Sequence, residues 1–191
     1  ASLHLLGECM RNQLFPIVYA ANKMDIAPPG VLEAFPERTL VACMADMELA
    51  LRRAASSGLI DYTSGQSGFT VRPDASLNEA QQKALAHMNQ RLEEAGGTGL
   101  SRLLDEVLFD QLQHIVVYPV QDESHWVDGD GRVLPDAFVV PDGLHAKALA
   151  GRVHTDLEAG FIRGVDGRTR RVVGADHELS DGDVLKIHAK S

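Results

Sequence analysis

The sequence of 191 residues has a formal net charge of −9, and 45% of its residues are hydrophobic. That hydrophobic content is sufficient for one or two domains with real cores, and no stretch approaches the ~18 continuous apolar residues of a membrane-spanning helix. The acidic balance excludes a protein that coats nucleic acid with its whole surface, because phosphate contacts require exposed Lys and Arg. We therefore expect a cytoplasmic globular protein with no membrane partner, in which any RNA contact is local.

The first predicted elements are an amphipathic helix over residues 2–13 and a buried strand over residues 15–21. The strand runs directly into the tetrapeptide Asn22-Lys23-Met24-Asp25. In an open α/β sheet, ligands bind beyond the carboxyl ends of the strands. The side chains of the tetrapeptide are therefore expected where a ligand is recognised.

An Asn-Lys-x-Asp sequence at this position predicts guanine recognition by Asn22, Lys23 and Asp25. The Asp25 carboxylate can accept hydrogen bonds from both the ring N–H and the exocyclic amine of guanine, while the Lys23 stem can lie along the purine face. Adenine presents the wrong pattern and would leave the carboxylate unsatisfied, at a cost of ~1–3 kcal/mol or more. The alternative is that the tetrapeptide is an ordinary polar turn after a strand.

A short strand over residues 39–43 and three helices are predicted next. The first helix has apolar residues at helical spacing from Met47 to Ala54, and Gly58 is placed to stop it. Residues 61–74 are rich in Gly, Ser and Thr and predict a surface loop. The second helix is expected to start at a capping box of Ser76 and Glu79 and to end at residues 96–97. Thr98 is expected to cap the third, which continues to about residue 114.

From residue 115 the hydrophobic period changes from that of a helix to that of a strand, and we place a domain boundary there. Strands over residues 115–120 and 137–140 are expected to pair across the Asp-Gly-Asp-Gly turn at 128–131. A helix with apolar residues from Ala146 to Leu157 on one face follows. Further short strands are predicted over residues 161–165, 171–173 and 184–188.

Six segments of the sequence together match one family in order: Asn-Lys-Met-Asp at 22–25, Glu-Leu-Ala-Leu-Arg-Arg-Ala-Ala at 48–55, Ile-Val-Val-Tyr-Pro-Val at 115–120, Leu-Pro-Asp-Ala-Phe at 134–138, His-Thr-Asp-Leu-Glu-Ala-Gly-Phe-Ile at 154–162 and Leu-Ser-Asp-Gly-Asp-Val at 179–184. On these segments, the sequence resembles the C-terminal half of an Obg-superfamily GTPase of the YchF-like type, archaeal branch. The last three segments resemble a TGS domain, a small β-grasp module shared with threonyl-tRNA synthetases and SpoT-type enzymes.

This resemblance implies an α/β fold with three parts. Residues 1–60 would form the C-terminal part of a P-loop GTPase domain, residues 61–114 a helical segment that completes or extends it, and residues 115–191 a β-grasp, ubiquitin-like TGS domain. The implied ligand is GTP. The family's second base-contacting motif, Ser-Ala-x, would place the backbone N–H of Ala45 at the guanine oxygen, although Met44 stands where the family has Ser.

No part of the sequence fits the phosphate-binding pattern Gly-x-x-x-x-Gly-Lys-Ser/Thr. We therefore expect the P-loop and the Mg²⁺-binding residues to lie in a part of the parent protein that precedes Ala1, and we expect this chain to have no catalytic residues and to be inactive alone. The two cysteines and eight histidines have no metal-ligand spacing, so we predict no metal site.

The resemblance also implies a ribosome or RNA partner, with the TGS-like part as the docking module. The best local candidates for phosphate contacts are Arg163, Arg168, Arg170 and Arg171, which flank a turn. They can equally be solvated residues paired with nearby acids. Two other functions stay open: a non-catalytic RNA- or protein-binding module with a vestigial nucleotide loop, and an amino-acid-binding or synthetase appendage, which leaves the Asn22 loop unexplained.

Overall fold

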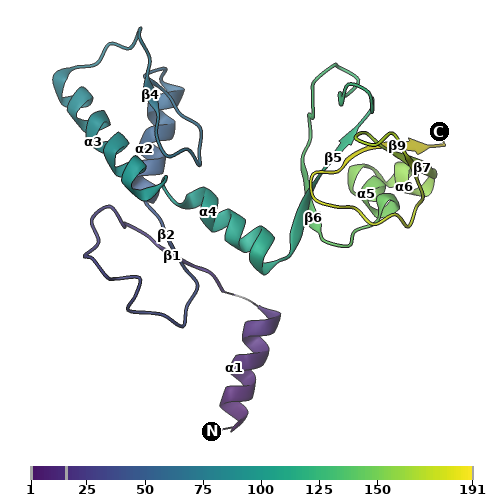
Figure 1. Ribbon diagram of the computed structural model, residues 1–191, viewed down its shortest axis with the longest axis horizontal. Helices are drawn as coiled ribbons and strands as arrows, with labels where there is room; N and C mark the ends of the chain where they lie inside the picture. Colours follow the sequence, from purple (N-terminus) through teal and green to yellow (C-terminus); the bar gives the residue numbers. More distant parts are fainter. Residues whose placement is uncertain (1, 16, 191) are drawn as a thin grey trace. The chain divides into compact units, whose positions relative to one another are not determined.

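The computed structural model of the chain describes residues 2–15 and 17–190. It contains two compact units, Ala1–Val107 and Leu108–Ser191. In Figure 1 the first unit contains the purple to teal elements, and the second contains the green to yellow ones. Between residues 2 and 190, no helix that the structure describes is long and apolar enough to cross a membrane.

The first unit combines helices with two small sheets. Its elements are α1 (Ser2–Leu14), β1 (Tyr19–Ala21), β2 (Leu40–Ala42), α2 (Ala45–Ser56), β3 (Ile60–Asp61), β4 (Thr70–Val71), α3 (Glu79–Ala95) and α4 (Leu100–Asp105). The strands β1 and β2 are parallel, with Tyr19 opposite Leu40 and Ala21 opposite Ala42. Both predicted strands are present here, but each is shorter than the sequence indicated, and the first is not buried as expected, because Tyr19 and Ala21 are half-buried and Ala20 is exposed.

The core of the first unit lies between α2, β3 and α3. Its buried members are Leu51, Ile60, Leu85 and Leu92. Leu51 and Leu92 are 0% exposed, so the apolar faces of α2 and α3 are anchored at these two positions. Burial of a leucine side chain stabilises a fold by roughly 1.5–3 kcal/mol, and this small cluster therefore fixes α3 beside α2.

Three sequence predictions for this unit were wrong in detail. Residues 61–74 are not only a loop, because their ends join an antiparallel ladder of β3 with β4. The capping box of α3 is formed by Asn78 and Gln81, whose side chains each bond the other's backbone N–H, and not by Ser76 and Glu79. Thr98 does not cap α4, whose N-cap residue is Gly99 without a side-chain bond. The end of α3 at Gly96, in the left-handed conformation, is as predicted.

The second unit is a five-stranded sheet with two helices. A π-helical segment, Glu106–Gln111, spans the boundary between the two units and precedes the first strand of this sheet. The elements of the second unit are β5 (His114–Val120), β6 (Phe138–Pro141), α5 (Ala146–Val153), α6 (Thr155–Ala159), β7 (Phe161–Asp166), β8 (Val172–Val173) and β9 (Val184–Ala189). The strand order is β6-β5-β9-β7-β8, and β5 and β9 are parallel while the other neighbours are antiparallel. This is the predicted β-grasp arrangement.

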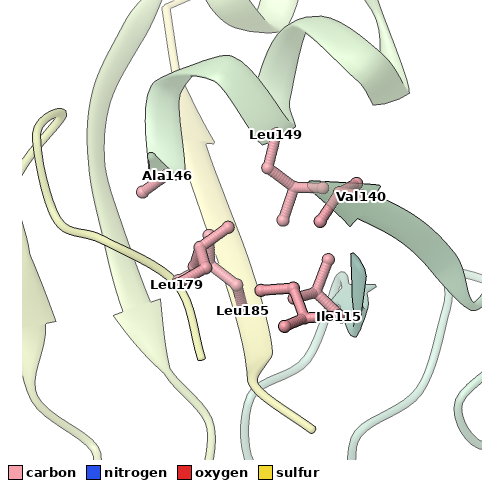
Figure 2. Close-up of a cluster of buried hydrophobic side chains, with 7 residues drawn as sticks. Ile115, Val140, Ala146, Leu149, Leu179 and Leu185 are labelled. Atoms are coloured by element: carbon pink, nitrogen blue, oxygen red, sulfur yellow. The ribbon is translucent and has the colours of Figure 1, made fainter. Parts of the chain in front are cut away.

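The core of this sheet unit packs α5 against one face of the sheet, as Figure 2 shows for Leu149 above Val140 and Ile115. The predicted pairing of β5 with β6 is confirmed, with Ile115 opposite Val140. The predicted single helix is wrong, because His154 adopts an extended conformation between α5 and α6. Its ring nitrogen accepts a hydrogen bond from the Asp156 N–H, so His154 caps α6.

Candidate functional site

The base loop, which we define as Asn22 to Asp25, follows β1 directly. Its backbone continues the connection to β2, because the Cys43 N–H donates to the Ala21 carbonyl at 2.9 Å and the Met24 N–H donates to the Cys43 carbonyl at 3.1 Å. Lys23 has a φ of 63°, in the left-handed region that non-glycine residues rarely occupy. The loop is therefore held in a specific, mildly strained conformation at the carboxyl end of the parallel pair.

Asn22 joins the base loop to the start of α2. Its side-chain oxygen accepts a hydrogen bond from the Ala45 N–H at 3.0 Å. Ala45 is the first residue of α2, where backbone N–H groups have no partner within the helix and carry partial positive charge. The structure thus brings Asn22 and Ala45 together, and it gives the Ala45 N–H a protein partner in place of the guanine oxygen that we had assigned to it.

The side chains of Lys23 and Asp25 are available to a ligand. Asp25 is half-buried and Lys23 is exposed. Among residues 2–15 and 17–190, none donates a hydrogen bond or forms an ion pair to the Asp25 carboxylate, and none pairs with the Lys23 ammonium. A half-buried carboxylate that lacks a protein donor can accept the two N–H groups of a guanine edge.

Met44 lies where the resemblance led us to expect a serine. It is only 5% exposed, and as the N-cap residue of α2 it makes no side-chain capping bond. Its N–H donates to the Thr98 carbonyl at 2.8 Å. The loop before α2 is therefore fixed by packing and by this backbone bond, without the hydroxyl that a serine would supply.

Glu48 is a buried carboxylate beneath this loop, and sequence analysis missed it. It is 2% exposed and accepts four side-chain hydrogen bonds. The donors are Arg52, Tyr62, Ser64 and Thr98. Burial alone would raise the pKa of Glu48, but the four donors outweigh it and lower the pKa to about 2. Burial and the adjacent Glu48 charge raise the pKa of Tyr62 to about 12.

This network connects three segments that are distant in the sequence. Glu48 lies on α2, Tyr62 and Ser64 follow β3, and Thr98 follows α3. Because Thr98 also accepts the Met44 N–H, Glu48 supports the loop after β2 through a single intermediate residue. The sequence held one signal for this buried carboxylate. Glu48 lies four residues after Met44 and three before Leu51, a spacing that places it on the buried face of the helix.

Gly99 permits the close approach of this segment to β2. Its φ is +82°, and a Cβ built at this position would lie 1.8 Å from the Ala42 carbonyl oxygen. No side chain fits there without moving the backbone. Between the base loop, β2 and the end of α3 lies a cavity of about 270 Å³, whose walls include Asp25, Met44 and Arg91.

The four arginines that the sequence suggested for RNA contacts fall into two pairs. Arg168 donates through Nε and Nη2 to the Gly182 carbonyl, at 3.0 and 2.8 Å, and its guanidinium lies 5.6 Å from the centre of the Trp126 ring. Arg170 donates to the hydroxyl and carbonyl of Ser124. Arg163 and Arg171 are exposed, and no described residue between 2 and 190 binds their guanidinium groups.

Two family models match the chain. Residues 20–122 match the model described as "Obg-like GTPase YGR210-like, G4 motif-containing domain", which covers the base loop, α2 and α3. Residues 131–189 match the TGS domain, which covers β6 to β9. Within the portion that the structure describes, no group of three or more His, Cys, Asp or Glu residues could hold a metal ion.

Two archaeal proteins are similar over nearly the whole chain. A GTP-binding protein of Methanocaldococcus jannaschii is 36% identical over 187 residues, which are 95% of this chain and 47% of that protein. The crystal structure of a GTP-binding protein from Pyrococcus horikoshii OT3 matches with a TM-score of 0.67 and 33% identity, over 95% of this chain and 48% of that one. The chain therefore spans about half the length of the relatives it matches.

Proposed function

The chain belongs to the Obg-like GTPase family with a YGR210-like G4 motif-containing domain, followed by a TGS domain, and we propose that it recognises the guanine base of GTP. In this proposal the Asp25 carboxylate accepts the ring N–H and the exocyclic amine. The Lys23 stem covers one face of the base. Asn22 holds the loop against Ala45, and the first turn of α2 faces the guanine oxygen.

The observation that carries this proposal is the state of Asp25. Its carboxylate has no protein partner among the described residues, while the Met24 N–H is bonded to the Cys43 carbonyl and the Asn22 side chain to the Ala45 N–H. A rigid loop with an unpaired acceptor suits recognition, because little ordering is required when a base binds. A vestigial loop would have no need of the constraints that hold Lys23 at a positive φ.

Base selectivity of the isolated chain tests this proposal. We expect GTP to shift the NMR signals of the base loop and of Ala45 in the isotope-labelled chain, and to bind at least tenfold more tightly than ATP. This difference in affinity is expected because adenine leaves the charged Asp25 acceptor unsatisfied, at a cost of about 1.5–3 kcal/mol in binding free energy. Equal affinities for GTP and ATP, or shifts confined to other residues, would contradict guanine recognition.

For the whole protein, we propose GTP hydrolysis with Mg²⁺ in a translation- or ribosome-associated cytoplasmic GTPase. The similarity to two GTP-binding proteins supports the part of this proposal that concerns GTP. We further propose that residues 1–60, 61–114 and 115–191 act as the three parts defined above: the end of the GTPase domain, its helical segment and the TGS domain. The competing proposal remains a non-catalytic RNA- or protein-binding module.

RNA docking through the second unit is proposed on the basis of Arg163 and Arg171. Both side chains are exposed and have no partner among the described residues, so they are available to phosphate groups. Arg168 and Arg170 already bind Gly182 and Ser124, and their substitution would also disturb the fold. A sharp test therefore changes only the first pair.

Charge reversal of that pair separates docking from stability. The double variant Arg163→Glu with Arg171→Glu should weaken ribosome or RNA binding in co-sedimentation and flatten the salt dependence of that binding. Each phosphate contact releases counterions from the RNA when it forms, so a lost contact means that fewer counterions are released on binding. Lys147→Glu with Arg152→Glu, two exposed positions on α5, is the matched control. If both double variants bind like the unmodified chain at every salt concentration, the docking surface is not this hairpin.

A further inference from the structure

The cavity beside the base loop separates it from α3, a helix that begins more than fifty residues further along the chain. One wall is formed by Met24, Asp25 and Met44, and the other includes Arg91 and Glu94. One side chain reaches across. The Arg91 Nη2 donates a short hydrogen bond to the Asp25 carbonyl oxygen, which is 66 positions away in the sequence.

Arg91 is itself held in place on α3. Its Nη1 donates to the Glu94 carboxylate at 3.2 Å, one helical turn further along. The Arg91 side chain is 37% exposed and that of Glu94 is 50% exposed. The guanidinium therefore has two partners in a planar fork, a geometry that lysine cannot reproduce.

Two other constraints tie the base loop to β2 and α2. The Asn22 side chain is bonded to Ala45, and the Met24 N–H is bonded to the Cys43 carbonyl. These contacts hold the loop on the side of β2 and α2. The peptide that follows Asp25 is held on both sides: the Ile26 N–H donates to the Lys23 carbonyl at 3.1 Å within the turn, and the Asp25 carbonyl oxygen accepts from Arg91 on α3. Without the Arg91 bond, this peptide is restrained only by the turn, and the direction of the Asp25 carboxylate is less firmly fixed.

We propose that Arg91 is a positioning residue for base discrimination: it fixes the Asp25 carbonyl and thereby aims the Asp25 carboxylate at the two N–H groups of guanine. This inference rests on the proposed function. It makes α3, which belongs to the helical segment, part of the base-recognition apparatus although α3 itself supplies no group to the base. Displacement of α3 then changes base selectivity.

The preference for GTP over ITP tests this role, since inosine lacks the exocyclic amine. We expect the unmodified chain to bind GTP on the order of tenfold more tightly than ITP, as measured by NMR titration. Arg91→Ala should bring this ratio close to one, and Arg91→Lys should give an intermediate ratio. Lys83→Ala, an exposed position on the same helix, is the matched control and should leave the ratio unchanged.

The outcomes distinguish this inference from the proposed function. If the unmodified chain does not prefer GTP over ATP, guanine recognition itself fails and the inference fails with it. If the chain discriminates but Arg91→Ala lowers the affinities for GTP and ITP equally, Arg91 has only a structural role and the inference alone is overturned. Should Arg91→Ala not fold, Arg91→Lys and Glu94→Gln carry the test, and an unchanged ratio in both overturns it.

Discussion

Glu48→Gln should destabilise the first unit in a way that depends on pH. The substitution keeps the shape of the side chain but removes the charge that four donors face. A carboxylate whose pKa is lowered from 4.5 to about 2 in the folded chain contributes roughly 3 kcal/mol to the free energy of unfolding at neutral pH. Because the hydroxyls of Tyr62, Ser64 and Thr98 can turn to accept from an amide, we expect a net loss of about 1–3 kcal/mol.

The sign of the pH effect follows from the direction of the shift. The folded-state pKa is depressed, so the stabilisation is fully present above pH ~4.5 and is lost as the pH falls toward 2. Urea unfolding followed by far-UV circular dichroism between pH 2 and 7 measures it, with Glu79→Gln, an exposed helix position, as control. The difference in the free energy of unfolding between Glu48→Gln and the unmodified chain should shrink as the pH is lowered from about 4.5 to 2. A difference that stays constant, or no difference at pH 7, would refute the role of the Glu48 charge.

Three further predictions concern other parts of the chain. The purified 191-residue chain should hydrolyse no GTP, since the sequence lacks a phosphate-binding loop, and saturable turnover in a preparation free of contaminating GTPases would contradict this. Gly99→Ala should lower the free energy of unfolding by more than ~3 kcal/mol, because the added Cβ meets the Ala42 carbonyl. The control Gly58→Ala, at a similar φ but in open space, should lower it by about 1–2 kcal/mol, and equal losses would refute the steric argument. Arg168→Ala should destabilise the second unit by about 1–3 kcal/mol, as followed by Trp126 fluorescence, and an unchanged midpoint would mean that its bonds to Gly182 contribute nothing.

Local signals in the sequence predicted much of this fold. Short apolar runs located β5 and β6, and the Asp-Gly-rich turn predicted their antiparallel pairing. The position of Asn22 after an apolar strand predicted a loop at the carboxyl end of a parallel pair, which the structure contains. In each case a pattern a few residues long carries the information, because strand period and turn chemistry act over that range.

The features that sequence analysis missed depend on long-range packing. Nothing near Arg91 indicates that it reaches Asp25, since the contact exists only once α3 has packed on α2. The break at His154 was missed because apolar spacing continues on both sides of it. Thr98 was read as a helix cap, the commonest role for a threonine before an apolar run, whereas its hydroxyl is bonded to Glu48.

The most direct measurement of guanine recognition is the nucleotide preference of Asp25→Asn. Xanthine presents an acceptor where guanine has its exocyclic amine, so an asparagine at this position should favour it. We expect the variant to bind GTP about 1–3 kcal/mol more weakly than the unmodified chain and to prefer XTP over GTP, in parallel NMR titrations. Asp74→Asn, an exposed carboxylate of the same unit, is the matched control and should keep the preference for GTP. If Asp25→Asn retains the GTP preference of the unmodified chain, Asp25 does not read the base.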